Sequence, residues 1–211
     1  MFYLRLNKVK IRNNYKLLGK ADVKIMSFIT LGDSDFPMLD DFYNTNDDNL
    51  KKELVKQAVT KVLSSRIMPV IQKIKDNQTI FFGDSGYNVL VSETTPTDLN
   101  WMLMAIKSNK KTRDNAELAK AILTDTTISS IVGAIATLAS LSNPVTAAIT
   151  ALSSIVADAL IEIYSNDKDK QLGLLLTSFT QNEHYPHGKR DVQNTSDTTG
   201  NMHIDYTIFA F

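Results

Sequence analysis

The chain has 211 residues, of which 43% are apolar, so it is long enough for one domain with a sizeable hydrophobic core. Lys plus Arg and Asp plus Glu both total 23, and no basic cluster stands out, so we do not expect nucleic acid as a partner. The sequence contains no cysteine, which excludes disulfides, thiolate catalysis and iron–sulfur clusters.

The first residues predict two strands rather than a targeting segment. Residues 2–12 alternate between apolar and polar side chains, and a slip in phase at Asn7 and Lys8 indicates a β-bulge. A second strand is predicted over 21–28, and the polar segment 13–16 favours a hairpin between the two. We expect no secretory signal peptide here, because the segment lacks an apolar run. The compartment stays unassigned.

An acidic loop and an amphipathic helix follow. Aspartates crowd into residues 33–48, but their spacing does not match an EF-hand loop, so we interpret them as a solvated loop with helix-capping carboxylates. Whether this loop binds calcium stays open. From Leu50 to Leu63, apolar residues recur every three or four positions opposite a lysine-rich face. This pattern predicts a first helical insertion over about 47–75.

Residues 79–110 return to strand patterns. The segment 83–86, Gly-Asp-Ser-Gly, matches four letters of the nucleophile segment of trypsin-like proteases. Every histidine lies at 184 or later, however, whereas that family has its catalytic His before the Ser, so a turn is the better interpretation. Residues 99–106 are apolar on both faces, which is typical of a strand in the middle of a packed sheet.

The end of the chain predicts two strands separated by a polar loop. The strands are expected over 173–179 and 202–211, and the loop over 181–201. His184 and His187 lie in this loop around a proline, so they lack the one-face helical spacing of a zinc site. We therefore expect a polar surface loop and no metal.

The strongest feature is an uncharged helical hairpin over 127–164. Helices are predicted over 114–123, 127–142 and 144–164, and no charged residue occurs over 126–157. Because such a pair cannot stay exposed to water, it must be covered by the protein's own sheets, by another subunit or by lipid. The residues that we assign to contact with a partner or a membrane are Ile128, Ile131, Ile135, Leu138, Ile149, Leu152 and Ile155.

Two interpretations of this hairpin stay open. Burial against protein is favoured, because the first helix is shorter than the roughly 20 residues that a bilayer requires and the second contains Asp158 and Glu162. Small residues that let helices approach closely are nevertheless typical of membrane helix pairs. Insertion into a bilayer, as in the hydrophobic hairpin of pore-forming colicins, is therefore the alternative.

Three segments together resemble a C2-like β-sandwich: the alternating opening strand, the central strand 101–106, and 169–173, Asp-Lys-Gln-Leu-Gly, before a strand. The last is similar to the Asp-Asp-x-Ile-Gly segment of that family. The resemblance implies an antiparallel sandwich used for binding. After the central strand, where calcium-binding members have aspartates, this chain has Lys107 to Lys110, so the resemblance implies no calcium at the usual site.

We therefore predict an α+β fold in one domain, 1–211: a C2-like antiparallel β-sandwich with two helical insertions, the second including the apolar α-hairpin. The sandwich is expected from about 1–31, 79–110 and 171–211, and the second insertion over about 114–164. We predict a non-enzymatic binding or assembly module, such as a component of a larger complex, whose partner is a protein or a copy of itself. No catalytic site, metal, cofactor or small-molecule substrate is expected. The alternative is a membrane-active, pore-forming protein.

Overall fold

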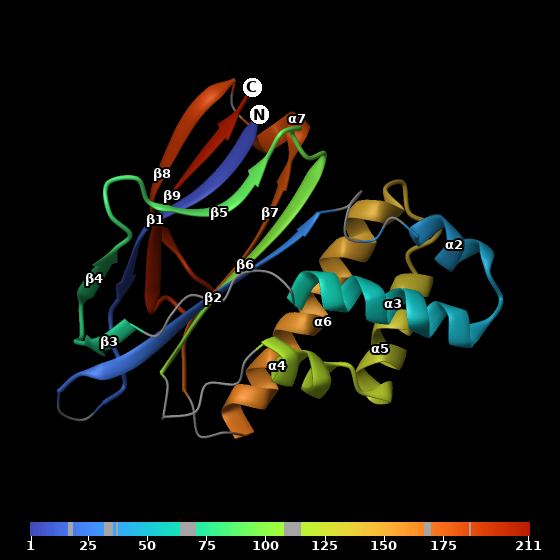
Figure 1. Cartoon of the computed structure of the whole chain (residues 1–211), viewed down its shortest axis with the longest axis horizontal. Coiled ribbons are helices and arrows are strands. Elements are labelled where there is room, and N and C mark those ends of the chain that lie inside the picture. Colours follow the sequence, from blue (N-terminus) through green and yellow to red (C-terminus); the bar gives the residue numbers. More distant parts are fainter. Residues whose placement is uncertain are drawn as a thin grey trace.

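The structure is a computed structural model, and it describes residues 1–16, 19–31, 36, 38–63, 71–107, 115–166, 170–185 and 187–211. Its architecture is α+β, with two antiparallel sheets and, in the described residues, six helices. Figure 1 shows the helices grouped beside the sheets and both termini together at one end of the strands. The predicted mixture of antiparallel strands and helices is confirmed.

Sheet A joins the two ends of the chain. Its strands are β1 (Phe2–Ile11), β4 (Gln78–Phe81), β5 (Tyr87–Ser92), β8 (Gly188–Ser196) and β9 (Met202–Ala210). β1 and β9 pair at its centre, and Phe211 N–H donates to Met1 O at 3.1 Å beyond the strand ends. β4 and β5 share the other side of β1, and β8 pairs only with β9. The predicted bulge is confirmed, since the β1–β9 register shifts between Leu6 and Lys8.

Sheet B has the order β3-β2-β6-β7. Its strands are β2 (Ala21–Leu31), β3 (Ile71–Ile74), β6 (Asp98–Lys107) and β7 (Lys170–Thr180). The two-sided apolar strand predicted over 99–106 is confirmed as β6, in the middle of this sheet. Trp101 lies in the core shared with sheet A, where its ring meets Tyr206 at 5.5 Å, whereas Met104 lies in the core shared with the helices. Both faces of β6 are therefore covered.

Five helices lie beside sheet B, and a sixth, short one follows β7 (Figure 1). They are α2 (Leu39–Asn44), α3 (Asp48–Leu63), α4 (Asn115–Ile122), α5 (Asp125–Ala136), α6 (Pro144–Asn166) and α7 (Gln181–His184). Apolar residues of α3, α5 and α6 form one core with Met26, Met102 and Leu174 of the sheet. Asp47 accepts the Asn49 N–H at 2.8 Å, which confirms the predicted carboxylate cap of α3.

The predicted hairpin between the first two strands is wrong. β1 pairs within sheet A and β2 within sheet B, so the chain crosses from one sheet to the other. The buried Asn14 stabilises this crossing, since its Nδ2 donates to Ile74 O at 2.9 Å and its N–H donates to Asp76 Oδ1 at 2.7 Å. Alternation indicates which face a strand buries, not which strand it pairs with.

Three further predictions are corrected. The described part of the first helical insertion is α3, which runs to Leu63, and residues 64–70 lie outside the described residues. Ile71–Ile74, predicted within that helical insertion, forms β3. The acidic loop contains α2, although residues 33–35 and 37 of it lie outside the described residues. The polar loop over 181–201 contains α7 and β8. β8 escaped prediction because an edge strand exposed on both faces shows no apolar alternation.

Candidate functional site

The hairpin residues predicted to contact a partner or a membrane are core residues in this structure. Five of them are fully buried: Ile128, Ile131, Ile135, Ile149 and Leu152. Ile155 and Leu138 are partly buried. The apolar cover that the sequence requires is supplied by α3 and sheet B of the same chain. These residues therefore form no exposed surface in this conformation, and their assignment to a partner or a membrane stays a prediction. A contact surface on the folded chain lies elsewhere.

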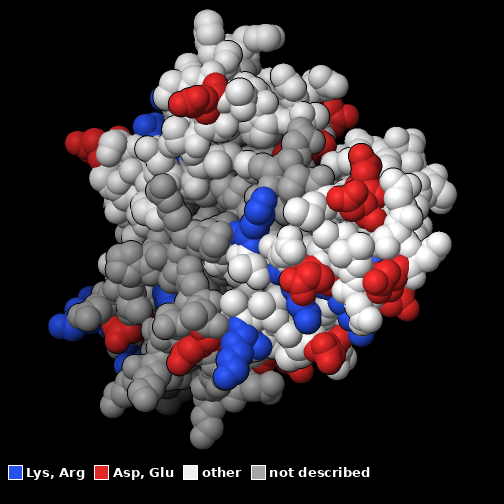
Figure 2. All heavy atoms as spheres, turned by 45° about the vertical axis from the view of Figure 1, so that its right-hand side comes forward, with Lys and Arg blue, Asp and Glu red and all other residues white. Residues whose placement is uncertain are grey.

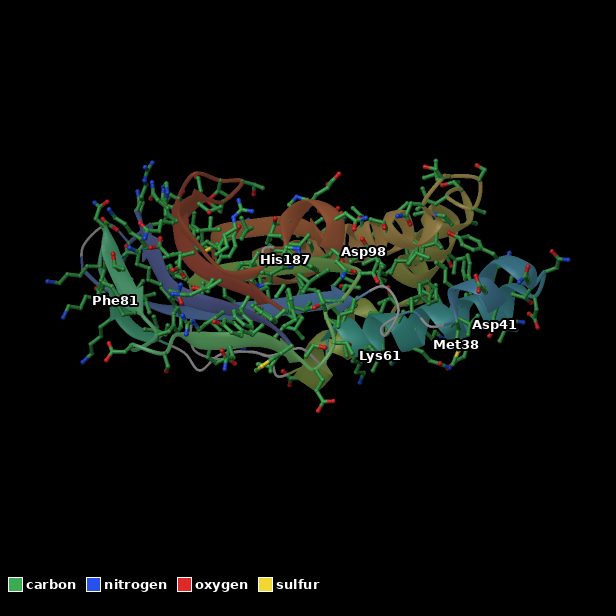
Figure 3. The ribbon with its side chains drawn as sticks, turned by 90° about the horizontal axis from the view of Figure 1, so that it is seen from above. Met38, Asp41, Lys61, Phe81, Asp98 and His187 are labelled. Carbon is green, nitrogen blue, oxygen red and sulfur yellow. The ribbon has the colours of Figure 1, made fainter. Side chains whose placement is uncertain are left out.

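Some exposed apolar side chains lie together at the terminal end of sheet A, where Phe211 and Val91, 86% and 53% exposed, adjoin the stacked rings of Tyr3 and Phe209. Others are scattered. Phe81 and Met38, which are 72% and 39% exposed, lie at opposite ends of the molecule in Figure 3. Charged side chains of both signs are intermingled on the face shown in Figure 2. Among the described residues, no one-sign charged patch therefore marks a site on the face shown in Figure 2. The strand edges offer a different kind of site, because their backbone groups can pair with another chain.

The edge of β7 that faces away from β6 is hydrogen-bonded at Leu174, which we call its lower closed point. Leu174 N–H donates to Asp197 Oδ2 at 2.7 Å, and Leu174 O accepts the Thr198 N–H at 2.9 Å. Both bonds go to the loop after β8, away from the paired strand β6. The N–H and C=O of every second residue in a strand point to the same side, and the β6–β7 register is continuous from Leu174 to Thr180. The backbone groups of Leu176, Ser178 and Thr180 therefore also point outward.

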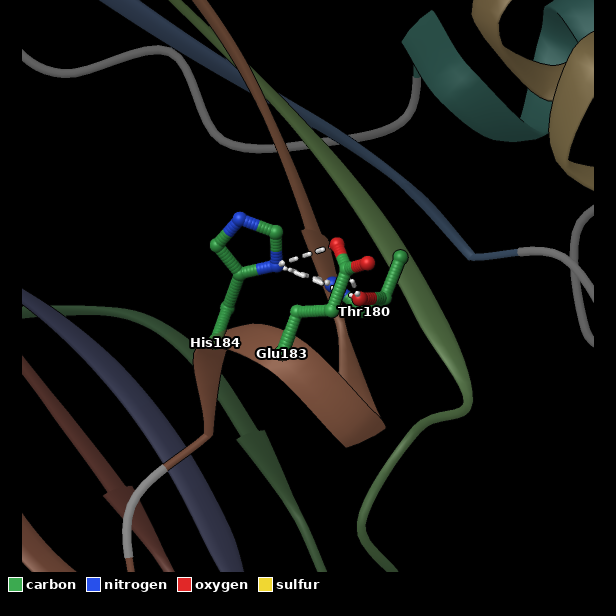
Figure 4. A network of polar contacts seen from close by, with 3 residues as sticks. All are labelled: Thr180, Glu183 and His184. Carbon is green, nitrogen blue, oxygen red and sulfur yellow. Dashed lines mark hydrogen bonds and ion pairs between the residues drawn. The ribbon is translucent and has the colours of Figure 1, made fainter.

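The same edge is hydrogen-bonded again at Thr180, its upper closed point. Thr180 N–H donates to Nδ1 of His184, which lies at the end of α7, at 3.1 Å (Figure 4). Between the two closed points, the N–H and C=O groups of Leu176 and Ser178 have no hydrogen-bond partner in the part of the chain that the structure describes. Both residues are exposed. We call Leu176 and Ser178 the open edge of β7.

The His184 cluster is a local cap. Nδ1 accepts from the Thr180 amide, and Glu183 Oε2 lies 3.9 Å from Nδ1, too far for a hydrogen bond (Figure 4). His187 is exposed, and no group of three His, Cys, Asp or Glu residues that could hold a metal occurs among the described residues. Ser85 lies in the predicted turn between β4 and β5, where Gly86 N–H donates to Gly83 O at 3.4 Å.

A pocket of about 240 Å³ adjoins the open edge, between α6 and sheet B. Its lining consists of Asn100, Trp101, Thr150, Ser153, Ser154, Leu176, Thr177 and Ser178, none of which is charged. Thr146 Oγ1 in the first turn of α6 donates to Asp98 Oδ2 at 3.0 Å, which fixes the start of the helix against β6. The helix and the edge strand thus form the two walls of a groove.

Polar side chains replace the apolar core at this end of sheet B. Thr30, Asn100 and Ser178 are neighbours across β2, β6 and β7. Ser153 Oγ donates to Thr30 Oγ1 at 3.0 Å, and Ser178 Oγ donates to Asn100 Oδ1. Asn100 is only 6% exposed, and its Nδ2 has no hydrogen-bond partner in the described residues. The amide lines the pocket, so its Nδ2 can donate to a group bound there.

Tyr185 lies just beyond α7, beside the same end of the groove. Its hydroxyl is buried without a hydrogen-bond partner among the described residues. Burial, and then the negative charge of Asp98, raise the pKa of Tyr185 well above its ordinary value of 10.0. The phenol is therefore neutral at physiological pH and adds no charge to this region.

Comparisons with known proteins give little beyond the fold. No protein-family model matches the chain. No curated protein matches its sequence. A solved structure described as Drosophila C2-DSL-EGF1 aligns with a TM-score of 0.42 and 9% identity, covering 99% of this chain and 65% of that one. This chain therefore spans just under two thirds of that structure, and the likeness is a weak resemblance of fold to a protein that contains a C2 domain.

The sequence predicted the strand over 173–179 but not the open edge. Its signal was present in part, because no charged residue occurs between Lys170 and Thr180. Nothing in the pattern distinguishes an edge strand from a central one, however, and the free amide of Asn100 depends on its neighbours in the sheet.

Proposed function

We propose that this protein is a non-enzymatic binding module that takes up an extended peptide segment as an additional strand on β7. The observation that carries the proposal is the open edge, at which four backbone hydrogen-bonding groups of Leu176 and Ser178 face outward between two closed points. An added strand gives affinity through main-chain hydrogen bonds, and neighbouring pockets give specificity. The groove between α6 and β7 supplies such a pocket.

The other strand edges are less suited to this role. β3 and β4 are each four residues long, and Lys73 in β3 has a left-handed backbone conformation, with φ of 62°. β8 is exposed and carries Lys189, Arg190 and Asp191 in succession. Short strands and charged side chains are the usual protection against pairing with another chain. β7 has 11 residues and lacks this protection along its open part.

In this proposal, a C2-like sandwich holds β7 rigidly, and the helical insertion serves as a wall of the groove instead of the contact surface. The partner is a protein segment in extended conformation, supplied by another component of an assembly. Nucleic acid, cofactors, metals and small-molecule substrates have no part in the proposal.

The test uses proline at the open edge. Leu176→Pro removes an outward N–H that β6 does not use, so the variant keeps the sheet but loses a donor for an added strand. Leu176→Ala shortens the same side chain and keeps the N–H. Short random peptides displayed on phage are selected against the full chain, and binding of the recovered peptides is measured by titration. We expect Leu176→Pro to weaken binding about tenfold or more and Leu176→Ala to weaken it much less.

Three results would count against strand addition. The first is recovery of no binding peptide. The second is peptides that bind both Leu176 variants equally well, with folding verified by circular dichroism. The third is a concentration-dependent dimer that Leu176→Pro abolishes, because the occupant of the edge would then be a second copy of the chain.

Membrane insertion is the second candidate function. Among the described residues, one helix, Pro144–Tyr164, is long and apolar enough to cross a bilayer, and 39% of its most apolar 18-residue window is buried. Dye release from neutral and anionic vesicles, at neutral and acid pH, tests this function. Release that Ile155→Asp abolishes, at a partly buried position, would support it, and absence of binding and release under all conditions would remove it.

A further inference from the structure

We infer that the pocket beside the open edge selects the added strand by one uncharged polar side chain: serine, threonine, asparagine or glutamine. The inference rests on the proposed strand addition and names the chemistry of its partner. It is carried by Asn100, which is 6% exposed, lines the pocket and uses only its Oδ1 in a side-chain hydrogen bond among the described residues.

The register of β7 determines which partner residue reaches the pocket. Leu176 and Ser178 pair with Met102 and Asn100, and Met102 belongs to the helix-facing core. Residues opposite one another on paired strands place their side chains on the same face of the sheet. A partner residue opposite Leu176 or Ser178 therefore extends toward α6 and the pocket, whereas the residue between these two extends to the opposite face.

The polar groups of the pocket define the side chain that fits. Thr150 Oγ1 donates to Thr146 O at 2.8 Å and Ser153 Oγ donates to Thr30, so both hydroxyl protons are already used. On the helix-facing side of the sheet, the side-chain groups of the lining without a hydrogen-bond partner in the described residues are Asn100 Nδ2 and the hydroxyl of Ser154. Thr177 pairs with Trp101 and lies on the other face. A donor amide next to a hydroxyl fits a carbonyl or hydroxyl oxygen of the partner.

Charged and apolar side chains fit less well. No lining residue carries a charge, so a carboxylate or an ammonium group of the partner would be desolvated there without an opposite charge. An apolar side chain would cover Asn100 Nδ2 and leave it without water or a protein acceptor. Only an uncharged side chain with an acceptor oxygen avoids both costs.

The experiment uses a peptide whose binding is weakened by Leu176→Pro and replaces its residues one at a time. At the position opposite Leu176 or Ser178, we expect asparagine or serine to bind about tenfold more tightly than aspartate, lysine or leucine. In the protein, Ser154→Lys should reverse the order and favour aspartate, since it places a cation at the pocket. Thr60→Ala on α3 is the matched control, because this residue lies outside the pocket lining and its hydroxyl is likewise used within its helix, where it donates to Lys56 O at 2.8 Å. It should leave the preference unchanged.

The outcomes separate this inference from the strand-addition proposal. Peptides that require the Leu176 N–H but bind equally well with any residue at these positions would overturn the pocket's selectivity and leave strand addition intact. A preference that Ser154→Lys does not change would also overturn it. Failure to recover any peptide sensitive to Leu176→Pro would overturn both.

Discussion

β7 and β8 are both edge strands, but their free edges are protected in different ways. β8 carries Lys189, Arg190 and Asp191, and its register with β9 shifts between Val192 and Thr195. Charges and bulges are general protection, because they disfavour any incoming strand. β7 has no charge after Lys170, and its protection is local: a loop closes it at one end and α7 at the other.

In the proposed function, this difference leaves one edge available to a partner strand. Local closure leaves an open edge of defined length beside a pocket, whereas general protection leaves none. The open part of β7 includes Leu176, which is 39% exposed, in a strand that is otherwise favourable for pairing. Such an edge is an aggregation hazard unless a partner covers it, which is the physical reason to expect one.

The largest effect is expected from a charge in the core that holds α6 against β7. Leu152 is fully buried, so Leu152→Asp should lower the free energy of unfolding by about 4 kcal/mol or abolish folding. The exposed Thr150→Asp on the same helix should change it by about 0.5 kcal/mol. Urea denaturation followed by circular dichroism measures both. An equally small loss at Leu152 would mean that the hairpin is not core, and the contact surface predicted from sequence would be restored.

A smaller loss is expected from opening the lower closed point of β7. Asp197 accepts the N–H groups of Leu174 and Met202 and the hydroxyl of Thr199. Asp197→Ala should cost about 3 kcal/mol and should speed hydrogen exchange at the Leu174 amide, because a buried donor loses its acceptor. Asp84→Ala, in the exposed turn before β5, is the control. Unchanged exchange at Leu174 would show that the loop does not close the edge.

These expectations show what the sequence could and could not provide. The bulge at Leu6 and Lys8 and the central position of 99–106 were predictable, because each leaves a local pattern of apolar residues. The pairing of β1 with β9 instead of β2, and the polar strand β8, were not, because both depend on contacts between distant segments. The hairpin pattern showed that 127–164 needs a cover, but periodicity does not identify which surface provides it.

Removal of the charges on β8 should allow two copies of the chain to associate through that edge. A variant with threonine at Lys189, Arg190 and Asp191 loses two positive charges and one negative, so its net charge falls by one, as in the control Lys120→Thr. We expect the triple variant, but not the control, to self-associate with rising concentration in light scattering. Two equally monomeric variants would show that charge does not protect β8.

The smallest effect is expected at Asp191 as the pH changes. Hydrogen bonds from Lys189, at 2.9 Å, and from Thr207, at 2.6 Å, hold the pKa of Asp191 below its ordinary value of 3.8. A lowered pKa stabilises the fold above the ordinary value, and this contribution is lost as the pH falls through the folded-state pKa. The difference in unfolding midpoint between wild type and Asp191→Asn should therefore shrink on acidification. A constant difference would contradict the assignment.

Residue-resolved hydrogen exchange along β7 of the free protein tests the central claim most directly, because it needs no partner. The amides of Leu175 and Thr177 bond to β6, and those of Leu174 and Thr180 bond to the two closing groups, so all four should exchange slowly. The amides of Leu176 and Ser178 should exchange much faster than these neighbours, at rates close to those of an unprotected chain. Slow exchange at Leu176 and Ser178, equal to that of their neighbours, would mean that the edge is already paired and would contradict strand addition.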